Sequence, residues 1–199
     1  MKSIKSFTTP IFAFILVIVT LFFPSISAFW VGPLLSVTIE IVLVFLGVFI
    51  LLTTIGILLI PKYLGASILK METHVIFQAF ETRDRFTLLC VFPLTMVFEE
   101  ALFRGFIAIG LSYIVSLGQW GAIFLSSAIF STYHLHTWPT FKDIRITTCF
   151  MVFSFALGIA CGYFVFTLGI IAVILLHWFS VFLIYYDLRT KMKHFQRPS

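Results

Sequence analysis

The stretch Phe98–Gly105, written FEEALFRG, places two adjacent carboxylates and a guanidinium inside a long apolar run. On an α-helix, Glu100 and Arg104 are four residues apart and share a face, so that they can form an ion pair. Glu99 points about 100° away around the same helix and does not share that face. The spacing therefore predicts Glu100 as a structural support paired with Arg104, and Glu99 as the carboxylate available for acid–base chemistry.

Two histidines occur in other apolar segments. His134 lies four residues after Phe130, and His177 lies within GIIAVILLHWFSVFLIYY, ahead of Ser180. Charged groups at the centre of a bilayer cost about 2.5–3.5 kcal/mol each, so ionisable residues placed there indicate function. Because three different segments deliver Glu99, His134 and His177 to overlapping depths, we expect these side chains to share one cavity that opens toward the cytoplasm.

The composition explains why those segments are treated as membrane helices. Of the 199 residues, 61% are hydrophobic and 11% are charged. In soluble domains, about a quarter of all residues are charged. The apolar residues form long blocks, which favours transmembrane helices over the short alternating strands of a barrel. The net charge of +5 does not indicate a nucleic-acid partner, because Lys and Arg separate the blocks instead of forming one basic face.

The predicted fold is an all-α, polytopic transmembrane bundle of about six spans. We expect these spans at about 11–31, 34–60, 87–116, 119–136, 146–166 and 169–186. Apart from Arg104, the Lys and Arg residues would all fall on one side, which predicts that both termini are cytoplasmic. The apolar run that ends near Ala28 also fits a cleavable signal peptide, although an uncleaved helix is the preferred interpretation.

We divide the chain into three parts. Residues 1–86 form an N-terminal two-helix region with a cytoplasmic amphipathic loop, 87–186 form a four-helix core, and 187–199 form a basic cytoplasmic tail. The loop is expected to carry an amphipathic helix at the membrane surface.

The order and spacing of the chemically active residues resemble a known family, the CAAX prenyl endopeptidase and bacteriocin-processing (CPBP) family of intramembrane glutamic peptidases. The resemblance covers about residues 87–186 and also includes two glycines, Gly158 and Gly162, that precede the last motif. The three motifs that carry it are Glu99-Glu100-x-x-x-Arg104, Phe130-x-x-x-His134 and His177.

The resemblance implies a role for each matching residue. Glu99 and His134 would hold and activate a water molecule for attack on a peptide carbonyl, and His177 would stabilise the developing oxyanion. Supporting roles would fall to four further residues: Glu100, Arg104, Phe130 and Ser180. One departure is clear, because the family carries Asn four residues after the third-motif histidine and this chain has Val181. Ser180 and the indole of Trp178 are the candidate substitutes for that donor.

The expected function is that of an intramembrane endopeptidase, without a cofactor, in the cytoplasmic membrane of a prokaryote. Its partner would be a membrane-embedded or lipid-anchored peptide. Three alternatives stay open. A zinc metallopeptidase would use Glu99, His134 and His177 as ligands, a bacteriocin-immunity or scaffold protein would keep the fold without catalysis, and a proton-coupled transporter would use the same groups as a relay.

Overall fold

The structure is a computed structural model that describes residues 15, 28, 33, 37–113 and 115–196, with side chains up to residue 193. Within these residues every regular element is helical. The predicted first span, 11–31, and the signal-peptide alternative fall largely outside the described part of the chain.

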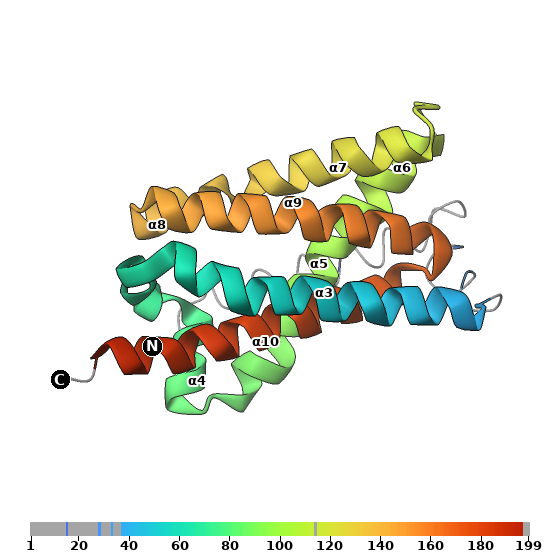
Figure 1. Ribbon diagram of the computed structural model, residues 1–199. Coiled ribbons are helices and arrows are strands. Elements are labelled where there is room, and N and C mark those ends of the chain that lie inside the picture. Colours follow the sequence, from blue (N-terminus) through green and yellow to red (C-terminus); the bar gives the residue numbers. More distant parts are fainter. Residues whose placement is uncertain (1–14, 16–27, 29–32, 34–36, 114, 197–199) are drawn as a thin grey trace.

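In the described part of the chain, three helices are long and apolar enough to cross a membrane. They are α3 (Ile39–Leu64), α9 (Ile144–Thr167) and α10 (Ile170–Gln196). These helices lie side by side, and α7 (Gln119–Tyr133) packs along the far side of α9 (Figure 1). The expected all-helical fold is therefore confirmed for the described residues, and these three helices correspond to three of the six predicted spans.

The side chains of Thr38 and Asp143 cap the N-terminal ends of α3 and α9. The hydroxyl of Thr38 accepts from the Ile41 backbone N–H at 3.4 Å before α3. The carboxylate of Asp143 accepts from the first N–H groups of α9. Such caps satisfy backbone donors that have no partner inside the helix.

The predicted span 87–116 is built from four consecutive helical segments instead of one straight α-helix. They are η3 (Thr87–Val91), α5 (Phe92–Glu100), η4 (Ala101–Ala108) and α6 (Ile109–Tyr113), of which η3 and η4 are π-helical. In Figure 1, α5 crosses α3 and α10 at a steep angle. The two adjacent glutamates end α5, and the longer π-helical segment begins at the next residue. π-Helical turns are rare and frequently occur at functional sites.

Short helices follow α3 and α7. The 3₁₀-helix η2 (Gly65–Thr73) and α4 (Val75–Thr82) come after α3. The short helices η5 (His134–His136) and α8 (Thr137–Phe141) come after α7. The apolar residues of η2 and α4, which the sequence assigned to an amphipathic surface helix, pack against the rest of the protein. Ile68, Ile76, Phe77 and Phe80 are buried in one core with residues of α5 and α10.

Ion pairs hold η2 and α4 to the other elements. Lys70 Nζ lies 2.9 Å from Asp143 Oδ2 at the start of α9, and Arg189 Nε of α10 lies 2.8 Å from Glu81 Oε1. The hydrogen bond from Lys70 lowers the pKa of Asp143 to about 2, so that Asp143 stays ionised at neutral pH.

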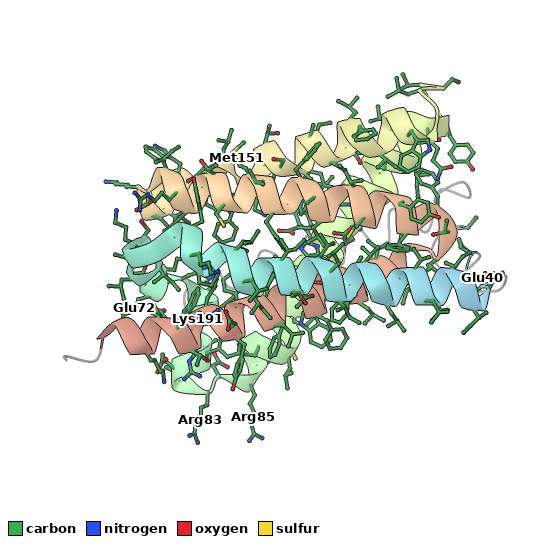
Figure 2. All side chains as sticks on the ribbon, in the orientation of Figure 1. Glu40, Glu72, Arg83, Arg85, Met151 and Lys191 are labelled. Carbon is green, nitrogen blue, oxygen red and sulfur yellow. The ribbon has the colours of Figure 1, made fainter. Side chains whose placement is uncertain are left out.

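The C-terminal turns of α10 belong to the folded body. Leu188 and Met192 are buried in the same core as α4, although the sequence divided residues 187–199 from the bundle. Pro61 lies inside α3 and has no N–H to offer the carbonyl of Ile57 four residues earlier. Lys191 Nζ donates to that carbonyl at 2.9 Å and also lies 2.7 Å from Asp187 (Figure 2 shows Lys191 beside α3).

Two glycines let α7 and α9 approach closely. A Cβ atom added at Gly158 would lie 3.0 Å from Ser127 Cβ and 3.2 Å from its Cα, and one added at Gly162 would lie 2.8 Å from Ile123 Cγ2. Small residues at such positions allow membrane helices to pack through their backbones. This contact fixes α7, and through it His134, relative to α9.

We predict that Gly158→Ala destabilises the protein by about 1–3 kcal/mol, because the obstructing atoms include the Ser127 backbone, which cannot rotate aside. Gly47→Ala is the matched control, since nothing lies within 4 Å of the added Cβ. Thermal unfolding in detergent would compare the two variants. Equal stabilities for Gly158→Ala and Gly47→Ala would contradict the close-packing explanation.

Candidate active site

The last turn of α5 brings two buried carboxylates into the protein. Glu100 has no exposed surface, and its Oε2 lies 3.1 Å from Arg104 Nε, the i,i+4 ion pair that the sequence predicted. Arg104 is also fully buried, and its guanidinium carbon lies 4.3 Å from the centroid of the Phe130 ring. A cation over an aromatic face is stabilised when water is excluded. Phe130 therefore supports the cluster from α7.

His177 on α10 connects the two carboxylates. Its Nδ1 lies 2.6 Å from Glu100 Oε1 and its Nε2 lies 3.7 Å from Glu99 Oε2. Only a protonated Nδ1 makes a hydrogen bond to a carboxylate, so the ring donates to Glu100. Sequence reasoning separated Glu99 from Glu100 by their helical faces, but the structure joins them through one imidazole.

His134 is oriented by the backbone of its own segment. Its Nδ1 lies 2.9 Å from the carbonyl oxygen of Phe130. Because a carbonyl can only accept, this contact places the proton on Nδ1 and leaves Nε2 with a free lone pair in the neutral ring. The Phe130 ring meets both imidazoles edge to face, at 4.9 Å from the ring of His134 and 5.7 Å from that of His177.

The three residues assigned to catalysis line one cavity of about 240 Å³. Most of its walls are apolar side chains from α3, α5, α9 and α10, and Glu99, His134 and His177 supply charged or polar surface. Val181 also lines this cavity, whereas Ser180 and Trp178 do not. Ser180 instead lies against α3, where Thr53 Oγ1 donates to its hydroxyl at 3.3 Å.

Sequence reasoning missed several residues that line this cavity. No role was assigned from the sequence to His74, Tyr133, His136 or Tyr185, but all four lie in the cavity wall. Burial lowers the pKa of His74 to about 4, and the nearby His136 acts in the same direction. No motif marks these residues; a helical projection of 177–188 would have placed Tyr185 near the face that carries Val181.

The donors required by the zinc alternative are not grouped. Among the residues that the structure describes, no three His, Cys, Asp or Glu side chains are arranged to hold a metal ion. His177 directs both ring nitrogens toward carboxylates. A four-coordinate zinc site needs three protein donors around one point, and the geometry of this cavity does not supply them.

The fold and this cavity define a class of protein, an integral, multi-pass, helical membrane protein with a buried carboxylate–histidine cluster. A family model for type II CAAX prenyl endopeptidase Rce1-like proteins matches residues 82–183, and the chain belongs to this family. No curated protein and no solved structure matches the chain. The family is one of membrane peptidases, and the resemblance seen in the sequence is therefore confirmed.

We predict that Arg104→Met destabilises the protein by about 3–5 kcal/mol, because it leaves Glu100 buried without its cation. The double variant Glu100→Gln/Arg104→Met removes both charges and should recover part of this loss. Arg85→Met is the control, since Arg85 is exposed and points away from the protein (Figure 2). The free energy of unfolding in detergent would be measured for all three variants. An Arg104→Met protein as stable as Arg85→Met would contradict the structural role of the Glu100–Arg104 pair.

Proposed function

We propose that the protein is an intramembrane endopeptidase in which Glu99 and His134 activate a water molecule to hydrolyse a peptide bond. The single observation that carries the proposal is that Glu99, His134 and His177, which come from three separate helical segments, line the same cavity. Membership of a peptidase family supports the same reaction class.

In this mechanism, water is held between the Glu99 carboxylate and the free Nε2 lone pair of His134. Glu99 takes a proton while the water oxygen bonds to the carbonyl carbon, and the carbonyl oxygen becomes an oxyanion. The proton then passes from Glu99 to the amide nitrogen, the C–N bond breaks, and a carboxyl and an amine terminus leave. His177 Nε2–H, which faces Glu99, donates to the oxyanion.

The charges around His177 support this role. When His177 is protonated, the two carboxylates of Glu99 and Glu100 are balanced by His177 and Arg104, so the buried cluster has no net charge. Pairing lowers the cost of burying each charge. Because Glu100 holds Nδ1 at 2.6 Å, the Nε2–H donor is fixed in direction before the substrate binds, which is the property that makes such donors effective.

We further propose the complete membrane arrangement, with six spans and both termini in the cytoplasm. Arg83 and Arg85 point away from the protein near α4, whereas Glu40 lies at the far end of α3, in its exposed first turn (Figure 2). Basic residues gathered at one end of the helices fit the cytoplasmic side. Under this proposal, the membrane is the cytoplasmic membrane of a prokaryote.

The substrate in this proposal is a membrane-embedded or lipid-anchored peptide. The apolar walls of the cavity favour an apolar ligand, and its position among the long helices favours one that enters from the bilayer. Val181 is the one feature that favours the alternative of a non-catalytic protein on the same fold, because it offers no hydrogen-bond donor to the cavity.

We predict that Glu99→Gln abolishes cleavage while leaving the protein folded, because the amide keeps the shape of the side chain and cannot accept a proton. Protein N-termini and membrane peptides would be compared in cells that make equal amounts of the wild type or the variant. Glu40→Gln is the matched control at an exposed glutamate. Identical cleavage products in wild-type and Glu99→Gln cells would refute the peptidase assignment and favour a binding protein.

We predict that the connection around Ser116 is outside the cell and the connection at Lys142 inside. Ser116 and Lys142 are both exposed and both have positive φ angles, in the links before α7 and before α9. In a background without the three native cysteines, an impermeant maleimide should label Ser116→Cys in intact cells and Lys142→Cys only after lysis. Labelling of Lys142→Cys in intact cells would overturn the orientation.

A further inference from the structure

The hydroxyl groups in the cavity wall differ in whether they are free to bind a ligand. The hydroxyls of Thr95, Thr137 and Ser154 each donate to a backbone carbonyl within one helical turn. Those of Tyr133 and Tyr185 make no hydrogen bond in the part of the chain that the structure describes. The two phenols are therefore the hydroxyl donors that this wall leaves available to a bound peptide.

Of the two, Tyr185 is the one held in place. It is 6% exposed, compared with 39% for Tyr133. Its ring stacks on His74 with centroids 5.3 Å apart and meets Phe77 edge to face at 5.2 Å. Phe92 of α5 closes a third side at 6.1 Å. A ring packed on three sides has little freedom to rotate, so its hydroxyl has a fixed position.

Tyr185 lies on the same helix as His177 and lines the same cavity. It follows His177 by eight residues on α10. Side chains of a helix lean toward its N-terminus, which here is the direction of His177. Glu99 lies in the wall of the same cavity. Val181 lies between His177 and Tyr185 on α10, and its side chain lines the cavity without offering a hydrogen-bond donor.

We propose that the Tyr185 hydroxyl is a catalytic hydrogen-bond donor to the substrate oxyanion, acting beside His177 Nε2–H. This inference rests on the proposed peptidase function. As the water oxygen bonds to the carbonyl carbon, negative charge grows on the carbonyl oxygen and the phenol hydrogen bond to it strengthens. The proton stays on Tyr185 throughout. A fixed donor in a cavity with mostly apolar walls stabilises such charge without having to reorganise.

The test uses a quenched fluorescent peptide that spans a bond whose products vanish in Glu99→Gln cells. Four purified variants would be compared with the wild type in detergent: Tyr185→Phe, Tyr133→Phe, Tyr186→Phe and Glu99→Gln. Tyr185→Phe keeps the packed ring and removes only the hydroxyl. Tyr186→Phe is the matched control, since Tyr186 is its neighbour and is 53% exposed. Rates are expressed per folded molecule after size-exclusion chromatography, which separates loss of folding from loss of catalysis.

The expected result is a fall in kcat of about 10²-fold for Tyr185→Phe, with KM changed less than about twofold and Tyr186→Phe like the wild type. If Glu99→Gln is inactive but Tyr185→Phe keeps at least half of the wild-type kcat, the assignment of Tyr185 is wrong and the peptidase function stands. A large loss in Tyr133→Phe with none in Tyr185→Phe would transfer the role to Tyr133. Cleavage that survives Glu99→Gln, or a search that yields no such bond, refutes both proposals.

Discussion

The buried contact between His177 and Glu100 is the interaction on which the rest of the site depends. It ties α10 to the end of α5 at 2.6 Å, and Arg104 and Phe130 then complete a buried cluster. Each charge is tolerable only because the others are present. The same contact orients His177 toward Glu99, so structural stability and the geometry of the cavity come from one set of residues.

Much of the architecture was predictable because a membrane interior restricts what a chain can do. Apolar blocks must be helical when every backbone group has to find a partner within the segment, and this reasoning located α3, α9 and α10. The Glu100–Arg104 pair followed from i,i+4 spacing. The convergence of Glu99, His134 and His177 on one cavity followed from their depths in three separate segments.

Other features depend on contacts between distant parts of the chain. Periodicity treats a helix as uniform, so it could not anticipate the π-helical segment Ala101–Ala108 that follows the glutamates. His74 and Tyr185 become neighbours only when α4 packs on α10, and no local pattern marks them. The amphipathic loop helix illustrates a real ambiguity, because the same apolar stripe suits a lipid surface or a protein core. Here Ile68 and Phe77 pack into the core.

The hydrogen bond from Lys191 to the Ile57 carbonyl, which Pro61 leaves without a helical partner, limits how this protein can be shortened. The family match ends at residue 183, yet a carbonyl of α3, far upstream of that match, is satisfied by a side chain beyond its end. A protein that kept α3 but ended at residue 183 would lose that lysine and leave the Ile57 carbonyl, which Pro61 cannot bond, without its partner. Replacing either flanking region alone would therefore have to keep a hydrogen-bond donor opposite the Ile57 carbonyl.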